Sequence, residues 1–204
     1  GNCICDDEAC REASKQEIIR RYFDALNALA KGSTSEKEAQ KIELLMNMAG
    51  ITVTDRKVVI KALERAKETD GPAAALELRD GRIITGKTTN LLGASAALLL
   101  NVLKVLAGID HETHIISPES IEPIQKLKVD YLKSKNPRLH TDEVLIALSA
   151  SAATNPQARL ALSQLPELAG CQAHTSVMLS DVDIKIFKKL EVQLTSEAVY
   201  EHAL

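Results

Sequence analysis

The sequence predicts an α/β protein in which a helical N-terminal subdomain (residues 1–70) precedes a three-layer α/β/α subdomain (residues 71–204). Three observations support this prediction. Apolar residues recur with a helical period over the first third of the chain, short β-branched runs alternate with helical stretches in the remainder, and an Asp-Gly turn separates the first two of these runs. Strands that alternate with helices typically form a sheet covered on both faces, so we expect a mixed sheet of five strands.

The helical subdomain is predicted from amphipathic spacing and from helix caps. Apolar side chains between residues 18 and 29 fall on one helical face. Ser33 and Glu36 form a capping box for a second helix that stops at Gly50, and a third helix follows Thr54. Apolar faces of this kind are usually core, so we expect no chemistry in this subdomain.

The α/β subdomain is predicted from turn residues and helix starts. Asp80 and Gly81 are a strong hairpin signal between two apolar runs, and Ser117 before Pro118 is typical of a helix start. We expect strands at 73–78, 82–87, 113–116, 175–179 and 192–195. Helices are expected at 90–107, 117–133 and 141–152, and two more begin near 156 and 180.

Composition allows a buried core and disfavours several classes of function. The 204 residues are 45% hydrophobic and 26% charged, with a net charge of −3 at pH 7. A basic stripe is absent and aromatic residues make up only 2%, so we expect no nucleic-acid binding. No apolar run is long enough to span a bilayer and no targeting segment is recognisable, so we expect a cytoplasmic protein without membrane contact.

The four cysteines do not have the spacing of a metal site. Cys3, Cys5 and Cys10 crowd the N-terminus, Cys171 lies far from them, and neither a C-x-x-C pair nor a suitably spaced histidine accompanies them. We expect reduced thiols, no metal and no cofactor. Because the sequence begins without Met inside an apparently ordered stretch, we also expect it to be a fragment.

Residues 81–88 read G-R-I-I-T-G-K-T and match the phosphate-loop pattern. A phosphate loop wraps backbone N–H groups around an anion and favours small residues, whereas Ile83, Ile84 and Thr85 are β-branched and favour an extended strand. Asp-Gly directly before them is hairpin chemistry. The hairpin is therefore the favoured interpretation, and ATP binding is a lesser alternative.

The order of hairpin, helix, strand and Ser-Pro turn resembles the cytidine-deaminase fold, in which a Pro-Cys-x-x-Cys turn holds zinc. Here Glu119 and Glu122 occupy the cysteine positions, and the helix that begins at Asn90 offers no zinc ligand. Deamination is therefore disfavoured, and Glu119 can simply complement a helix dipole. Two facing helix starts would still attract an anion, and the candidate ligand-binding residues there are Lys87, Thr88, Asn90, Ser95 and Glu119.

A polar loop between residues 135 and 143 concentrates groups that transfer protons or bind anions. His140 and Glu143 are the candidate catalytic residues, and Asn136, Arg138 and Asn155 are candidate ligand-binding residues. The alternative is structural: residues 141–143 are typical helix-capping residues, and Arg138 can pair with a nearby acid. The sequence does not decide between these interpretations.

Several longer strings look like the bacterial domain of unknown function 1846. They lie at residues 15–22, 80–83, 85–88, 92–95, 116–119 and 136–143. The resemblance implies that the chain is the C-terminal portion of a longer protein, with a nucleotide-fold-like region ahead of it. It supplies no activity, and it implies that an active site could be shared with that preceding region.

The leading hypothesis is a bacterial protein that binds a small anionic metabolite in an enzyme-like cleft. Lys87, Arg138 and the helix starts at Asn90 and Pro118 would hold the anion, while His140 and Glu143 would transfer protons. The alternative is a non-catalytic assembly module whose helical half packs against its own N-terminal region or against a second copy in a homo-oligomer. Whether the protein is an enzyme is left open.

Overall fold

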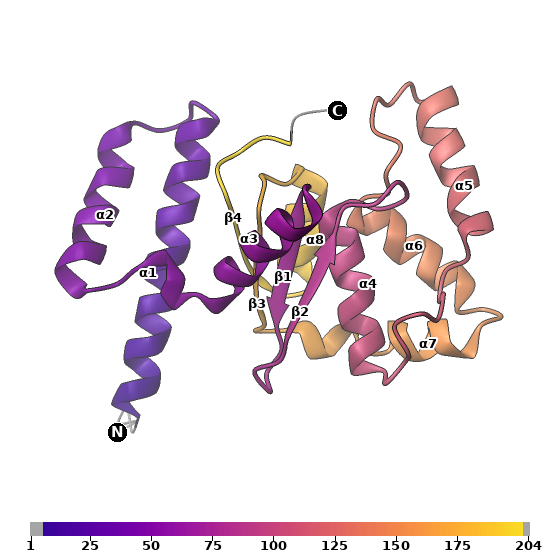
Figure 1. Cartoon of the computed structure of the whole chain (residues 1–204), viewed down its shortest axis with the longest axis horizontal. Coiled ribbons are helices and arrows are strands. Elements are labelled where there is room, and N and C mark those ends of the chain that lie inside the picture. Colours follow the sequence, from indigo (N-terminus) through magenta and orange to yellow (C-terminus); the bar gives the residue numbers. More distant parts are fainter. Residues whose placement is uncertain (1–5, 202–204) are drawn as a thin grey trace.

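The structure, a computed structural model, describes residues 6–201. A helical hairpin stands beside a sheet that has helices on both faces (Figure 1). The hairpin consists of α1 (Asp7–Ala30) and α2 (Glu36–Ala49). The Asp6 carboxylate caps α1 by accepting a hydrogen bond of 2.9 Å from the Ala9 amide, and Gly50 ends α2 in the left-handed region at a φ of 65°.

The helix α3 (Lys57–Thr69) links the hairpin to the sheet. It follows a short 3₁₀ turn (Val53–Asp55), and its two neighbouring valines face different partners. Val59 joins the core of the hairpin with Ile19 and Phe23, whereas Val58 packs with Ala75 of the sheet. The buried side of α3 therefore serves both parts of the molecule.

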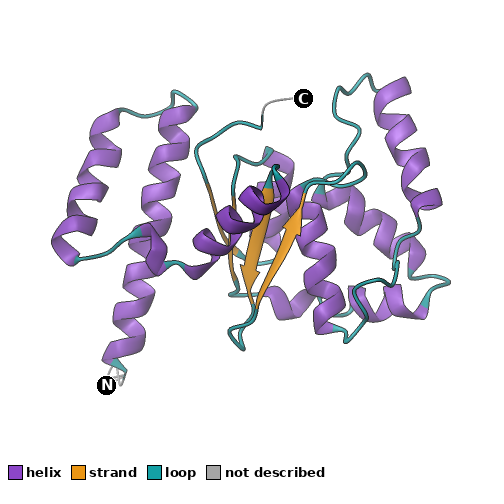
Figure 2. Ribbon diagram, in the orientation of Figure 1, coloured by secondary structure: helices purple, strands orange, loops and turns teal. Residues whose placement is uncertain are grey.

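The sheet has four strands in the order β2-β1-β3-β4 (Figure 2). They are β1 (Ala73–Glu77), β2 (Ile83–Lys87), β3 (Gln172–Thr175) and β4 (Gln193–Ser196). β1 pairs antiparallel with both β2 and β3, and β3 pairs parallel with β4. The protein is thus α/β with a mixed sheet, and β2 and β4 are its edges.

Two expectations about the sheet were wrong. Four strands, not five, are present in the described chain, and the run at 113–116 is a loop. Ile115 and Ile116 are nevertheless buried in the main core, so this run is apolar because it packs and not because it pairs.

Helices cover both faces of the sheet. α4 (Ala94–Leu106) packs with Ala74 and Leu76 of β1, on the face opposite to Ala75 and α3, because successive strand residues point to opposite sides. The remaining helices are α5 (Pro118–Lys126), continued by a π turn (Leu127–Tyr131), α6 (Thr141–Ser151), α7 (Pro156–Leu162), a 3₁₀ turn (Leu165–Leu168) and α8 (Asp181–Lys189). In residues 6–201, no helix combines the length and the apolar character that crossing a bilayer requires.

The phosphate-loop string forms the hairpin. Gly81 adopts a φ of 82° at the turn, and residues 83–87 are strand β2. α4 begins at Ala94, several residues beyond Lys87, whereas a phosphate loop leads directly into its helix. Gly86 has a packing role, because a Cβ built there would lie 2.5 Å from the Leu98 Cα. The structure therefore does not support ATP binding through this string.

Candidate functional site

The N-termini of α4, α6 and α8 lie near one another at the end of the sheet where β2, β3 and β4 terminate. The loop before α6 runs beside the loop before α4: the Leu139 amide donates to the Leu91 carbonyl at 2.9 Å, and the Gly93 amide donates to the Leu139 carbonyl at 3.2 Å. The start of α8 joins them, because Asp183 accepts a hydrogen bond of 2.9 Å from the Thr141 amide. The three loops belong to distant parts of the chain, as Figure 1 shows.

His140 and Asp183 form a hydrogen-bonded pair at this end of the sheet. The Nδ1 atom of His140 lies 3.0 Å from the Oδ2 atom of Asp183. Asp183 is 3% exposed and also accepts hydrogen bonds from the Thr141 hydroxyl at 2.8 Å and the Ser180 hydroxyl at 2.7 Å. The imidazole is one-third exposed, so one ring nitrogen is fixed by a buried carboxylate while part of the ring meets solvent.

The charges of the two side chains reinforce each other. The hydrogen bond to Asp183 raises the pKa of His140 although burial acts in the opposite direction. Burial by itself would raise the pKa of Asp183, but the hydrogen bonds from His140, Thr141 and Ser180 together lower it to about 2. Asp183 is therefore ionised at neutral pH, and it favours the imidazolium form of His140.

Glu143 is occupied by structural contacts. Its Oε2 atom accepts a hydrogen bond of 2.8 Å from the His140 amide and one of 2.7 Å from the Nζ atom of Lys128. Lys128 is buried and also donates to the Arg138 carbonyl at 2.6 Å. These contacts close the loop 134–140 onto the π turn after α5, which is the role expected of a capping carboxylate.

The candidate ligand-binding residues Asn136, Arg138 and Asn155 also form hydrogen bonds or ion pairs within the protein. Arg138 pairs with Glu201 at 2.7 Å, and its own amide donates to the Asn136 side chain at 3.0 Å. The Asn155 side chain caps α7 by accepting from the amides of Gln157 and Ala158 at 2.9 and 3.3 Å.

The candidates at the two other predicted helix starts lie in different surroundings. Glu119 is exposed in the first turn of α5, where its own backbone amide lowers its pKa, as a carboxylate that complements a helix start would show. Ser95 is buried inside α4, and the Thr88 hydroxyl is a buried group without a hydrogen-bond partner among the described residues. Neither Glu119 nor Ser95 lines the groove that Lys87 lines.

Lys87 and Asn90 line a groove of about 870 Å³ that follows the edge strand β2. Eleven of its 22 lining residues are aliphatic and none carries a carboxylate. Its five basic residues are Arg65, Lys87, Lys104, His111 and His114. The structure thus separates the predicted residues into a groove with basic lining residues and the His140 cluster, and the segment 88–93 connects the two.

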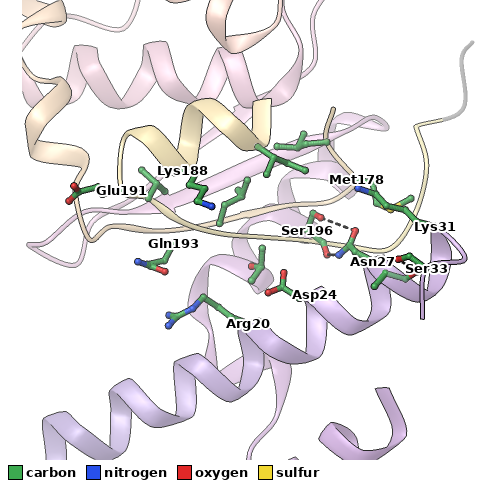
Figure 3. Close-up of a pocket in the computed structure, with 16 residues that line it drawn as sticks. Arg20, Asp24, Asn27, Lys31, Ser33, Met178, Lys188, Glu191, Gln193 and Ser196 are labelled. Atoms are coloured by element: carbon green, nitrogen blue, oxygen red, sulfur yellow. Dashed lines mark hydrogen bonds between the residues drawn. The ribbon is translucent and has the colours of Figure 1, made fainter. Parts of the chain in front are cut away.

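A second cleft, of about 600 Å³, lies between α1 and the edge formed by β4 and α8. Figure 3 shows Asp24 and Asn27 of α1 directed towards the segment that carries Ser196. The Asn27 amide donates to the Ser196 carbonyl at 2.8 Å, and the Ser196 hydroxyl donates back to the Asn27 side chain at 3.1 Å. This pair joins the helical hairpin to the sheet.

Potential metal ligands and free thiols are scattered over residues 6–201. Among them no three His, Cys, Asp or Glu side chains converge as a metal site requires. Cys10 is an exposed free thiol and Cys171 a buried one. Cys3 and Cys5 lie outside the described residues.

Three residues that sequence reasoning missed are central to these sites: Asp183, Lys128 and Lys104. Asp183 lies in the first turn of a predicted helix, and nothing local marks it further, because its partner His140 lies 43 residues away in the chain. Lys128 and Lys104 lie on helices, where a lysine is ordinarily exposed. No local pattern distinguishes them, so only the tertiary structure could have identified them.

The fold and these sites define an α/β protein with a helical hairpin, a ligand-sized groove along β2 and a His-Asp pair outside that groove. Residues 54–204 match the family described as "Domain of unknown function DUF1846, C-terminal", and residues 1–50 match "Domain of unknown function DUF1846, N-terminal". The chain therefore belongs to the DUF1846 family, as the resemblance predicted.

Curated relatives carry names that assign no function. The chain is 58% identical over 200 residues to a UPF0371 protein of Corynebacterium aurimucosum, covering 98% of this chain and 40% of that protein. It is 48% identical over 202 residues to a UPF0371 protein of Streptococcus thermophilus, covering 99% of this chain and 41% of that protein. The chain thus spans about 40% of the length of these relatives.

Proposed function

We propose that this part of the DUF1846 protein supplies anion-binding and proton-transfer groups to an enzyme that acts on a small anionic metabolite. His140 is the proton-transfer group, and Asp183 orients it. Lys87 and Asn90 attract the anion at the groove. Since the chain is a minority of its relatives' length, the preceding region of the whole protein completes the site.

The observation that carries this proposal is the hydrogen bond of 3.0 Å between His140 and the buried Asp183. A carboxylate on Nδ1 fixes the ring orientation and stabilises the imidazolium that forms when the other nitrogen takes a proton. Nε2 of His140 has no hydrogen-bond partner within residues 6–201, and the ring is partly exposed. These are the properties of a general acid–base.

Glu143 has a different role in this proposal from the one that the sequence favoured. Its carboxylate is held by the His140 amide and by Lys128, so it fixes the backbone at His140 and does not receive the proton itself. Arg138, paired with Glu201, remains an anion-binding candidate only if that exposed pair opens. The cytidine-deaminase-like arrangement belongs to the proposal as well. Its support is that the hairpin, α4 and α5 follow one another along the chain, although the strand expected between the two helices is a loop.

A thermal-unfolding screen of this chain and of a full-length relative, against small phosphates and carboxylates, tests the anion site. We expect a subset of these anions to raise Tm by several degrees at concentrations of about 100 times Kd. Lys87→Ala and Arg138→Ala should reduce this shift, and Arg21→Ala, at an exposed arginine of α1, should not. Unchanged shifts in both test variants would rule out the proposed anion site.

The proton-transfer role has its own test. In a titration followed by NMR, an anion that binds at the site should change the ring resonances and the pKa of His140. His140→Gln, which keeps a polar side chain at the start of α6, should leave the binding in place while it removes the titration. If no anion that binds to the chain changes the ring resonances of His140, the proposed role of His140 is contradicted.

The rival function, a non-catalytic assembly module, is favoured by one specific observation. Leu44, Leu45 and Met48 of α2 are 61%, 48% and 79% exposed, and they lie within the segment that matches the N-terminal part of the family. Exposed apolar side chains that gather on one helix often mark an interaction surface. The proposed occupants are the N-terminal region of the same protein or a second copy.

A further inference from the structure

The groove along β2 has an apolar wall with basic groups near both ends. Every residue of β2 lines it, and Leu100, Val105, Ile109 and Ile116 form much of the apolar surface. Lys87 stands where β2 ends, and Lys104 stands near the end of α4. A volume of about 870 Å³ falls in the range of small-molecule sites, which are mostly apolar and carry a few placed polar groups.

The distance between the two lysines follows from the packing of α4 on β2. Asn101 of α4 lies beside Thr85 of β2, because its amide donates to the Thr85 carbonyl at 2.9 Å. Lys87 is two strand residues beyond this point in one direction, and Lys104 is three helix residues beyond it in the other. Rises of 3.3 and 1.5 Å per residue place their backbones about 11 Å apart along the groove.

Lys104 is a largely buried lysine whose ammonium group forms no ion pair with a described carboxylate. Its side chain is among the buried residues at 9% exposure, and it donates a hydrogen bond to the His111 carbonyl. No described carboxylate lies within 4.0 Å of it, and burial lowers its pKa although Asp110 and Glu112 act against this from farther away. A buried charge is costly unless it is paired, so an anion in the groove would relieve this cost.

Arg65 contributes an unsatisfied donor to the groove. Its Nε atom is buried and has no hydrogen-bond partner among the described residues, while its Nη1 atom pairs with Glu68 at 3.2 Å. Buried donors are normally satisfied in a folded protein. Two cationic side chains with unused donor capacity therefore line a groove that contains no carboxylate.

We propose that this groove binds an amphipathic anion, namely a medium-chain aliphatic carboxylate or phosphate. The aliphatic body lies along Leu100, Val105 and Ile109, the anionic group pairs with Lys104, and Lys87 attracts a second anionic group where the ligand has one. This inference rests on the proposed function in one respect: it names the chemical class of the anionic metabolite.

An added β-strand is the obvious rival occupant, since β2 is an edge. Arg82 and Thr88 form backbone hydrogen bonds with the β1 side, to Leu78 and Pro72, so by alternation the backbone groups of residues 83, 85 and 87 point outwards. The Thr85 carbonyl, at the centre of this edge, is already taken by Asn101. An incoming strand would have to displace that side chain, whereas an aliphatic chain would not.

Calorimetric titration of the chain with octanoate, octylamine, acetate and inorganic phosphate tests the proposal. We expect octanoate to bind, octylamine not to bind, and acetate to bind more weakly than octanoate by about tenfold or more, because it buries no chain. Lys104→Met keeps an unbranched side chain of similar size and removes the charge, and it should weaken octanoate binding by about tenfold or more. Lys126→Met, at an exposed lysine of α5, is the matched control and should bind as the unchanged chain does.

Several results would overturn the inference. They are equal binding of octylamine and octanoate, full octanoate affinity in Lys104→Met, or saturation by a short acidic peptide with no response to octanoate. The comparison of ligands on the unchanged chain keeps the test decisive even if Lys104→Met fails to fold. If acetate or phosphate binds in a Lys87-dependent way and octanoate does not, this inference fails while the proposed function stands. If no anion binds, both fail.

Discussion

At the scale of single residues, Asp183 joins two helices that are distant in sequence. Its Oδ1 atom accepts from the amide and the hydroxyl of Thr141, and its Oδ2 atom contacts Ser180 and His140. One buried carboxylate therefore satisfies the start of α6, the cap of α8 and the imidazole. Charge-assisted hydrogen bonds of this kind are stronger than those between neutral groups.

Asp183→Asn should lower the pKa of His140, because it removes the negative charge that holds the imidazolium. NMR titration of the ring protons measures this directly. Asp181→Asn is the control, since Asp181 is an exposed carboxylate on the same helix. A His140 pKa that stays raised in Asp183→Asn would contradict the pairing.

The same pair predicts how the free energy of unfolding depends on pH. The pKa of Asp183 is lowered from 3.8 to about 2, so its contribution of about 2 kcal/mol is present above pH 4 and disappears as pH falls towards 2. The pKa of His140 is raised from 6.5, so its contribution is complete below pH 6.5 and disappears as pH rises through the raised value. Urea unfolding should give both losses in the unchanged chain, and Asp183→Asn should show neither.

Gly86 supplies the third prediction at this scale. A Cβ there would meet the Leu98 backbone, so Gly86→Ala should push α4 away from β2 and lower the free energy of unfolding by about 3 kcal/mol. Gly71→Ala is the matched control, because the nearest atom to its Cβ would be the Thr69 carbonyl oxygen at 3.8 Å. Chemical denaturation of the two variants measures the difference, and equal stability would show that α4 packs less closely than the structure has it.

At the scale of elements, Arg56, at the start of α3, forms hydrogen bonds with the sheet and with α1. Its side chain is 1% exposed and donates to the Thr195 hydroxyl at 3.0 Å, the Ala173 carbonyl at 3.0 Å and the Gln16 side chain at 3.2 Å. It also donates to Gln172 and to the Gln193 carbonyl. All these acceptors are uncharged, and burial lowers the pKa of Arg56 to about 10.

Arg56→Lys should destabilise the protein although it keeps the charge. A lysine has three donors on one nitrogen and cannot reach acceptors on α1, β3 and β4 together, so we expect a loss of about 3 kcal/mol. Lys57→Ala removes an exposed neighbour and should change the stability little. Denaturant unfolding checks both variants, and a loss below about 0.5 kcal/mol in Arg56→Lys would show that the five contacts are not needed.

At the scale of the whole molecule, two Asn side chains connect the sheet edges to the surrounding helices. The side-chain amide of Asn101 in α4 donates a hydrogen bond to the Thr85 carbonyl of β2. The side-chain amide of Asn27 in α1 donates one to the Ser196 carbonyl of β4. Unpaired edges invite association between chains, and side chains that occupy their backbone groups reduce this tendency. Exposed apolar side chains are found on several elements, and those of Leu44, Leu45 and Met48 gather on α2.

This surface predicts self-association of the chain when it is studied by itself. Light scattering after size exclusion should give a mass that rises with concentration towards about twice that of the monomer. Met48→Lys should reduce this rise, whereas Gln40→Lys adds the same charge to an exposed polar position of α2 and should not. A strict monomer at every concentration would argue against α2 as an assembly surface.

The parts of the fold that were predictable depend on short-range chemistry. Asp80 and Gly81 form their turn whatever surrounds them, and Ser180 caps α8 through a residue three positions away. The predicted strand at 113–116 was wrong because pairing needs a free partner edge, which no local pattern reports. His140 lies in a polar cluster with Asp183, and its role as a catalytic group stays a prediction.

The sequence by itself determined the helical hairpin, the turn at Gly81, the family and the residue types available for chemistry, because helix periods, caps and turns act over a few neighbouring residues. The tertiary structure alone decided that Gly86 serves packing, that Asp183 meets His140, and that Lys104 is buried beside an apolar groove. These facts depend on contacts between segments far apart in the chain. Burial and charge pairing are properties of the assembled core, and no stretch of sequence carries them alone.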